Sequence, residues 1–234
     1  MSQRLPYITD EILIQEVRKV LTIANNAVEN AEMNLHRSKV DPFSAAFDSL
    51  RQLIPVSEWF EQEKARQIQK TMQNAIGNFH QAILGNMTGW NDLGVGGVVD
   101  VKNDTRKIIA EIKNKSNTTK GNHKPSIYDD LNSLINGTYK GYTSYYVEVI
   151  PGSKKPYDKP FVPSDNKTSE RRPSNEKIRV IDGRSFYALA SGTPNALELL
   201  YKALPVIIVE AMGMPDRRQE PDPLFEELFR RVYP

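Results

Sequence analysis

The chain of 234 residues contains no cysteine and no long apolar run. Without cysteine, a disulfide framework and a thiolate zinc site are both excluded, and the composition suits a reducing cytoplasm. Nowhere do about 18 apolar residues follow one another, so no membrane-spanning helix is expected. The first residues, MSQRLPYITDE, become acidic before any apolar run and therefore do not have the pattern of a signal peptide. These absences predict a cytoplasmic protein.

Histidine is also scarce. The three histidines, His36, His80 and His123, lie far apart in the sequence and on different expected elements. No cluster of histidine and asparagine indicates a metal-dependent nuclease of the ββα type. His80 follows Phe79 in an apolar helical pattern, so a packed or hydrogen-bonded histidine is expected there rather than a catalyst.

Positive charge is concentrated in two segments, although the formal net charge is only +2. From Lys102 to Lys124 there are seven Lys or Arg and two acids, a net of +5. Residues 151–184 contain nine bases and five acids, a net of +4. Basic charge gathered in this way favours a polyanionic partner such as nucleic acid. The alternative is an ordinary solvated basic face.

Helical periodicity dominates the first 85 residues. One helix is expected from Thr9 or Asp10 to Leu35. A second begins at Asp41-Pro42, an N-cap followed by a proline in the first turn, and has Phe43, Ala46, Phe47 and Leu50 at helical spacing. A third is expected from Ser57, as its cap, to Gly85, so residues 1–88 are predicted to form an N-terminal helical region. The expected buried stripe of the third helix consists of Ala65, Ile68, Met72, Ala75, Phe79 and Ile83.

Strands and helices alternate from residue 89 onward. The sequence predicts a β-hairpin, with strands over 98–101 and 107–113 and a polar turn around Asn103-Asp104. Five prolines in residues 151–177 predict a mobile loop. The order predicts a mixed α/β fold in which helices flank a central β-sheet, with residues 89–234 as the catalytic core of one compact domain. The remaining expected elements are a helix near Pro125, strands over 144–150 and 177–181, a helix from Thr193-Pro194 that is kinked or broken at Pro205, and a short acidic helix over 221–231.

Three charged residues, Asp100, Glu111 and Lys113, interrupt the apolar runs of the expected hairpin. Alternate residues of a strand share a face, so Glu111 and Lys113 point the same way, and strand pairing places Asp100 beside Glu111. Two adjacent carboxylates repel each other unless a cation holds them, and oxygen ligands favour Mg²⁺. A lysine on the same face would point at whatever the metal binds. This arrangement predicts a Mg²⁺-dependent phosphodiester hydrolase; the alternative is a surface hairpin with charges at its edge.

The pattern of an acid, any residue and a lysine occurs three times in the chain. Asp100-Val101-Lys102 has no carboxylate on a preceding strand, and Asp165-Asn166-Lys167 lies in the proline-rich loop. Only Glu111-Ile112-Lys113 both follows an apolar strand and has a partner acid on the strand before it.

This stretch resembles the signature of the PD-(D/E)xK nuclease superfamily, in which the first acid and the E-x-K motif lie on adjacent strands. Val99 stands where that signature has proline, a difference that touches no metal ligand. The segments EIKNKSNTTKG, IGNFHQAILG and GRSFYALASGTPNALELLYKALP resemble type II restriction endonucleases of the AvaII and SinI group, which cut GGWCC or GGNCC. The resemblance extends over about residues 55 to 210.

The resemblance implies a restriction-endonuclease-like fold and a role for each of the three residues. Asp100 and Glu111 correspond to the metal-binding acids, and Lys113 corresponds to the catalytic lysine. The superfamily often adds an acid from the helix before the sheet. The sequence does not decide among Glu58, Glu61 and Glu63 for that position.

The polar segment after the expected catalytic strand offers amides, hydroxyls and cations within reach of a cleaved phosphate. Arg184 leaves a short strand and is expected either to contact a guanine or to pair with Asp182. The alternative for the segment is an ordinary polar loop. The residues predicted to contact DNA are Lys115, Asn117, Thr118, Lys120, His123 and Arg184.

Three functions are compatible with these features. The first is a sequence-specific endonuclease that acts on double-stranded DNA as a homodimer, because a two-fold dimer matches a palindromic site. The second is a nuclease that recognises DNA structure, such as a junction or repair enzyme. The third is a DNA-binding module without catalytic activity. The central base of the site, the cut position and the dimer interface stay open.

Overall fold

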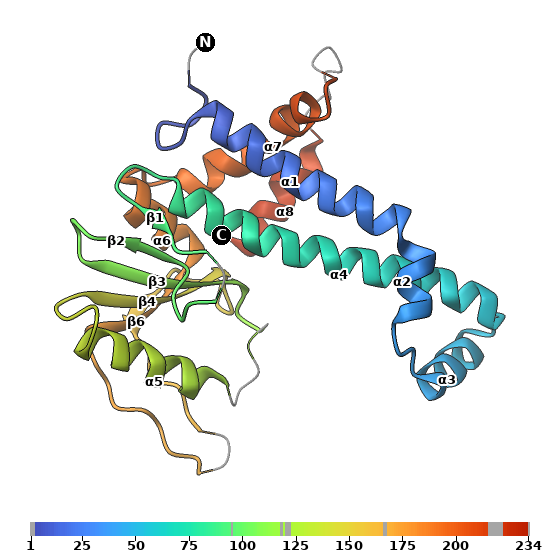
Figure 1. The fold of residues 1–234 in the computed structure, drawn as a ribbon, viewed down its shortest axis with the longest axis horizontal. Coiled ribbons are helices and arrows are strands. Elements are labelled where there is room, and N and C mark those ends of the chain that lie inside the picture. The colour runs from blue at the N-terminus through green and yellow to red at the C-terminus, as the bar shows by residue number, and fades with distance from the viewer. Residues whose placement is uncertain are drawn as a thin grey trace. The chain divides into compact units, whose positions relative to one another are not determined.

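The computed structural model describes residues 3–94, 96–117, 119, 123–165, 168–214 and 222–233. The chain divides into two compact units (Figure 1). One consists of Met1–Val17 together with Gly77–Pro234, and the other is Arg18–Ile76. Within the described residues, no helix is sufficiently long and apolar to cross a membrane.

The unit Arg18–Ile76 is entirely helical. It contains most of α1 (Asp10–Glu29) and α4 (Val56–Gly85) and all of α2 (Ala31–Arg37) and α3 (Pro42–Gln52). The predicted start of α3 is confirmed, because the Asp41 carboxylate accepts a hydrogen bond from the Phe43 backbone N–H at 3.0 Å. An Asp side chain at this position satisfies a backbone donor that has no partner within the helix.

Two helical predictions need correction. The helix expected from residue 9 or 10 to Leu35 is divided at Asn30 into α1 and α2. The third helix begins at Val56, so Ser57 lies inside it and is not its cap. Its expected apolar stripe is buried at Ala75, Phe79 and Ile83, whereas Ala65 and Met72 are exposed. Helical spacing predicts which residues share a face, but not how much of the helix has a neighbour to cover that face.

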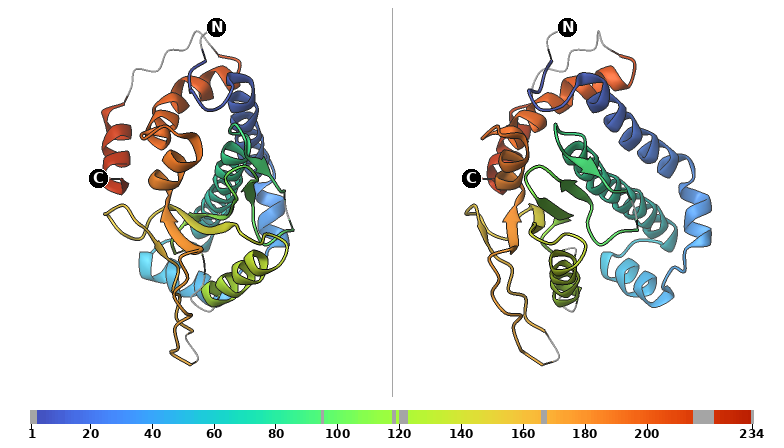
Figure 2. Two further views of the ribbon diagram at one scale, coloured as in Figure 1. Left: turned by 90° about the vertical axis from the view of Figure 1, so that its left-hand side faces the viewer. Right: turned by 60° about the vertical axis from the view of Figure 1, so that its left-hand side comes forward.

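The unit containing residues 77–234 is built on one six-stranded sheet with the order β1-β2-β3-β4-β6-β5. Strands β3, β4 and β6 are parallel to one another, and the other pairs are antiparallel. This mixed sheet with flanking helices confirms the predicted fold class (Figure 2). The strands are β1 (Asn91–Asp92), β2 (Val101–Asn103), β3 (Ile108–Lys115), β4 (Thr143–Ile150), β5 (Asp158–Pro160) and β6 (Ile178–Asp182).

Helices cover both faces of this sheet. Tyr128, Leu131 and Ile135 of α5 (His123–Asn136) form a core cluster with Ile109 and Tyr146. Phe186 of α6 (Gly183–Ser191) packs on the other face, against Tyr145 and Trp90. Tyr145 and Tyr146 point to opposite faces because successive residues of a strand alternate. The remaining helices are α7 (Ala196–Ala211), which contains Pro205, and α8 (Pro223–Val232).

Three elements differ from the sequence predictions. The first hairpin strand begins at Val101 rather than Val98, after the turn and bend residues that precede it. The segment 151–177, expected to be a mobile loop, contributes the edge strand β5. Helix α6, which was not predicted, begins at Gly183, where an added Cβ would come within 2.3 Å of the Val149 carbonyl oxygen. Only glycine permits this close approach of the helix to β4.

The packed histidine predicted at position 80 is confirmed. The Nδ1 atom of His80 lies 2.7 Å from the hydroxyl of Tyr187, and its ring packs edge-on against that of Tyr187. Burial lowers the pKa of His80 from its ordinary 6.5 to about 4. The folded protein therefore favours the neutral imidazole.

Because the pKa of His80 is lowered, the folded protein is expected to lose stability in mild acid. Below pH 6.5 the unfolded chain binds a proton at position 80 that the folded chain does not accept until about pH 4. The free energy of unfolding should therefore fall across this window by on the order of 3 kcal/mol. Urea denaturation at several pH values should show this component in the native protein and lose it in His80→Gln. The exposed histidine variant His36→Gln is the control and should retain it; an unchanged pH profile in His80→Gln would contradict the assignment.

Candidate active site

The antiparallel pairing of β2 and β3 brings Asp100 beside Glu111. Val101 faces Ala110 in this register, and one residue earlier the Asp100 N–H donates to the Ala110 carbonyl at 2.9 Å. The Asp100 carboxylate accepts a hydrogen bond from the Ile112 N–H at 2.6 Å. The main chain of β3 therefore holds Asp100 on both sides of position 111, through its backbone N–H at Ala110 and through its carboxylate at Ile112. The expected hairpin is present, and it brings the two acids together.

Burial raises the pKa of both carboxyl groups. Burial and, after it, the negative charge of Asp100 together raise the pKa of Glu111 to about 7. For Asp100, burial raises the pKa, while the hydrogen bond from Ile112 and the charge of Lys113 oppose this change. Placing two negative charges here is costly without a cation, so the site favours a positively charged partner.

Lys113 supplies a positive charge at the same place. Its amine forms an ion pair with the Glu111 carboxylate, and the two residues share one face of β3. The lysine side chain is 33% exposed, while that of Glu111 is 12% exposed. The structure therefore brings the three predicted catalytic residues into one cluster, in which the lysine is more open to solvent than Glu111.

The oxygen donors of Asp100 and Glu111 fit a hard divalent cation. Mg²⁺ is usually held by one or two carboxylates together with water and substrate phosphates. Across the described ranges of the chain, no group of three or more His, Cys, Asp or Glu side chains is arranged to hold a metal. Asp100 and Glu111 are thus the carboxylates that the hairpin offers to a metal.

The helical acids considered as additional ligands already have partners within the unit Arg18–Ile76. The Glu61 carboxylate pairs with Lys64 at 2.7 Å. Glu63 is buried, and both of its oxygens accept hydrogen bonds of 2.7 Å from the Arg66 guanidinium. Both carboxylates are thus neutralised without a metal, and Glu58, in the first turn of α4, is exposed.

A further acid, which the sequence analysis did not select, lies on the strand next to Lys113. Glu148 of β4 is in register with Lys113 and only 6% exposed. Its carboxylate accepts a hydrogen bond from the Lys124 amine at 2.9 Å and another from the Tyr157 hydroxyl. Burial and the contact with Glu148 raise the pKa of Tyr157 well above its ordinary value, so the phenol stays protonated and acts as a donor.

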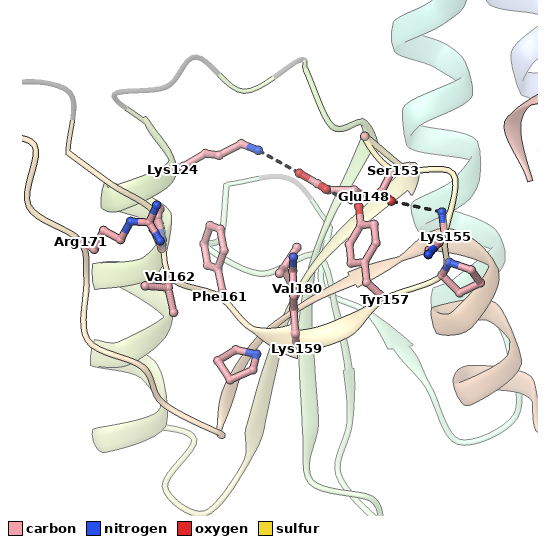
Figure 3. Close-up of a pocket in the computed structure, with 14 residues that line it drawn as sticks. Lys124, Glu148, Ser153, Lys155, Tyr157, Lys159, Phe161, Val162, Arg171 and Val180 are labelled. Carbon is pink, nitrogen blue, oxygen red and sulfur yellow. Dashed lines mark hydrogen bonds and ion pairs between the residues drawn. The ribbon is translucent and has the colours of Figure 1, made fainter.

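Glu148 lies in the wall of an open cavity of about 590 Å³. Figure 3 shows the side chains of Lys124 and Tyr157 extending to Glu148 from different segments, with Arg171 at the opposite end near Val162. The cavity wall also contains Lys155 and Lys159. The cavity wall thus contains four cationic side chains and one buried acid whose charge is already paired, which leaves the cavity with an excess of positive charge.

The residues predicted to contact DNA are placed as follows. Lys115 is the last residue of β3, where it pairs with Ile150 of β4. Asn117 is exposed in the turn that follows, and His123 is the exposed first residue of α5. These three lie at the carboxyl end of β3 or in the segment that follows it. Thr118 and Lys120 lie outside the described residues.

Arg184 belongs to a different group of side chains. A hydrogen bond from Lys202 and, more weakly, the charge of Arg184 lower the pKa of Glu198 on α7. The alternative partner Asp182 is the N-cap of α6; its carboxylate accepts hydrogen bonds from Ser185 and from the Tyr157 N–H. The structure therefore associates Arg184 with α7 rather than with the acids of the hairpin.

Comparison with known proteins places the chain among the restriction endonucleases. A family model described as Eco47II restriction endonuclease matches residues 5–213. The chain therefore belongs to the Eco47II restriction endonuclease family. No solved structure matches it.

Two curated relatives extend over most of the chain. The type II restriction enzyme Eco47II of Escherichia coli is 44% identical over 216 residues, which cover 89% of this chain and 90% of that protein. The type II restriction enzyme Sau96I of Staphylococcus aureus is 29% identical over 211 residues, which cover 88% of this chain and 80% of that protein. The predicted resemblance to type II restriction endonucleases is confirmed.

Proposed function

We propose that the protein is a type II restriction endonuclease that hydrolyses phosphodiester bonds of double-stranded DNA with Mg²⁺ held by Asp100 and Glu111. The observation that carries this proposal is the pairing of the two half-buried carboxylates with Lys113 on adjacent strands. The arrangement has the features of the PD-(D/E)xK signature. Membership of that superfamily is part of the proposal.

Each of the three residues has a separate task. Asp100, fixed by the Ile112 N–H, and Glu111 present oxygen atoms to the metal. When bound, Mg²⁺ activates water and neutralises charge on the phosphate. Lys113 is free to turn toward the phosphate when its partner Glu111 binds a cation, and its amine then stabilises the negative charge that develops there.

The cationic cavity near Glu148 favours a polyanionic substrate. Lys124, Lys155, Lys159 and Arg171 come from α5 and from the segment that follows β4. Phosphate contacts of this kind position a duplex without reading its sequence. We propose that the cavity wall contacts the DNA backbone beside the cleaved bond.

The proposed substrate is a short palindromic site of the GGWCC or GGNCC kind, which the resemblance to the AvaII and SinI group implies. The proposed assembly is a homodimer, because each chain offers one carboxylate pair with its lysine and two strands must be cut. The cleavage belongs to restriction-modification.

Digestion of a plasmid with and without Mg²⁺ tests this function. A site-specific endonuclease produces discrete fragments that require the metal. Nicks confined to branched or supercoiled regions would instead support a structure-specific nuclease. Binding without cutting at any divalent metal concentration would overturn the proposal and favour a DNA-binding module.

Base recognition is expected from the segment after β3 together with Arg184. Guanine presents two acceptors in the major groove, which suit Lys or Arg donors such as Lys115, Lys120 and Arg184, with Asn117 as a bridging amide. Alanine at a base-reading residue should cost about 1 to 3 kcal/mol on the cognate duplex alone. Alanine at a phosphate-contacting residue should weaken binding to all sequences and reduce the salt slope by about one.

The measurement compares each variant on the cognate duplex and on single-substituted duplexes at two salt concentrations. Lys140→Ala, in the turn between α5 and β4, is the control and should change neither quantity. If no variant alters the ratio of cognate to substituted affinity, base reading belongs to another surface, such as the Gln- and Asn-rich face of α4 or the segment after Pro151.

A further inference from the structure

Helix α3 exposes large apolar side chains along one face. Phe43, Phe47 and Leu50 are 74%, 78% and 72% exposed, and their spacing places them in one stripe. Leu53 and Val56, just after the helix, are 90% and 48% exposed. Single exposed apolar residues are common on proteins, but five concentrated in one short segment are a feature of interaction sites.

Helix α3 does not pack on the rest of its unit through its large apolar side chains. Its buried residues are the small side chains Ala45 and Ser49. The indole N–H of Trp59 on α4 donates to the Asp48 carboxylate at 3.2 Å, which anchors α3 through a polar contact. The large apolar side chains are therefore left on the outer face, where the rest of the unit does not cover them.

Leu53 adds a second sign that this face has a partner. It ends α3 in the left-handed conformation, with φ of 56°, where glycine or asparagine is usual. A leucine in this conformation is strained and here also exposes 90% of its surface. Burial of the Leu53 side chain in a complex would remove its exposed apolar surface from water, and the free energy gained would offset the backbone strain.

The area of the patch fits a dimer contact. Taking roughly 150 to 250 Å² for a large side chain, the exposed fractions of the five residues amount to about 600 Å² in each copy. A two-fold contact doubles this to about 1,200 Å², the lower end of the range for stable protein interfaces. The patch alone therefore reaches the smallest area that is usual for a stable dimer contact.

The charges on α3 favour a second copy over DNA. Its charged residues, Asp48 and Arg51, form an ion pair of 2.6 Å with each other. A face without net charge gains nothing from phosphates. It can meet its own image without repulsion, because in a two-fold contact the same patch lies on both sides.

We propose that the face formed by Phe43, Phe47, Leu50, Leu53 and Val56 is the two-fold interface between two copies of this chain. The inference rests on the proposed function, in which two copies each cut one strand. In this proposal the unit Arg18–Ile76 holds the two copies of the enzyme together.

The first experiment replaces an interface residue by a charged one in the full-length protein. Sedimentation velocity should show the native protein as a dimer at micromolar concentration and Phe47→Glu as a monomer, with the dissociation constant raised at least 100-fold. Because Phe47 is 78% exposed, circular dichroism and thermal melting should show an unchanged fold. Leu228→Glu, at an exposed leucine of α8, is the control and should remain dimeric. A dimeric Phe47→Glu, or a monomeric Leu228→Glu, would overturn the assignment.

The absence of cysteine allows a second test that leaves the apolar patch intact. Ala46 is exposed between Phe43 and Phe47, so Ala46→Cys with a short bismaleimide should yield cross-linked dimers. Ala65→Cys, at an exposed alanine of α4, is the matched control and should yield none. Equal cross-linking of both variants would contradict the interface. Loss of plasmid cleavage by every form of the protein would refute the proposed function while leaving these two results to decide the interface.

Discussion

Lys113→Ala is expected to bind DNA almost as the native protein does and to cleave it about 10² to 10³ times more slowly. The amine is assigned to charge that develops at the phosphate during the reaction, and a preorganised group of this kind contributes roughly 3 to 4 kcal/mol. Its ground-state contribution is smaller because the structure shows it paired with Glu111 rather than directed away from the protein. The loss should therefore appear in the rate and not in affinity.

A gel-shift assay and a single-turnover digest on the same preparation separate these two quantities. Lys115→Ala is the matched comparison, because Lys115 lies two residues further along the same strand. It is expected to weaken binding and to leave the rate of the bound complex nearly unchanged. Substantial cutting by Lys113→Ala at saturating protein would assign the role to another cation.

Asp100→Asn and Glu111→Gln are each expected to abolish metal-dependent cleavage. The amides keep the shape of the side chains, and Asn at position 100 can still accept the hydrogen bond from the Ile112 N–H. Each nevertheless removes one of only two carboxylates at the proposed metal site, and a hard cation binds neutral amide oxygens weakly. Without metal, both variants should bind DNA slightly better, since a charge that repels phosphate is gone.

Calorimetric titration of Mg²⁺ or Mn²⁺ onto the protein–DNA complex should show one class of sites lost in both variants. The control is Asp104→Asn, which removes an exposed carboxylate from the β2–β3 turn, where it pairs with Lys102 at 2.8 Å. It should retain the native isotherm and cleavage. An unchanged isotherm for Asp100→Asn or Glu111→Gln would return the hairpin to a purely structural role.

The hairpin could be predicted because two independent patterns agree there. Strand alternation selects the face on which Glu111 and Lys113 lie, and the cost of burying charge explains why a strand would contain them. Together they predict that Asp100 faces Glu111, and the observed register agrees. The roles of these residues cannot be deduced in the same way, because they depend on ligands that the chain alone does not contain.

Glu148 is a buried acid that lies outside the sequence prediction, although the same reasoning applies to it. It is the one charged residue in the apolar strand Thr143–Ile150, as Glu111 is the acid of Ile108–Lys115. The rule that selected Glu111 therefore applies equally to Glu148. The E-x-K motif identifies only the strand of Glu111. The partners of Glu148 are Lys124 and Tyr157, which belong to other segments, and no local sequence pattern connects them to it.

Other elements depend on contacts that local sequence does not encode. Strand β5 consists of only three residues in a proline-rich segment and exists because β6 provides a neighbour. Helix α3 has the apolar spacing of a buried helix, yet Phe47 and Leu50 lie on its outer face. A buried helix and an exposed helix can have the same periodic apolar stripe. Only the structure therefore shows whether another element covers that stripe.

The ion pair between Lys113 and Glu111 would couple the binding of the proposed metal to the binding of DNA. While the lysine holds the glutamate, it acts as an internal counter-ion that competes with the metal, and the glutamate in turn competes with phosphate for the lysine. DNA that draws the lysine away frees the carboxylate, so each ligand should strengthen the binding of the other by the same factor. Cooperativity of this kind would keep the proposed metal site weak in the free protein and complete it only when DNA is bound.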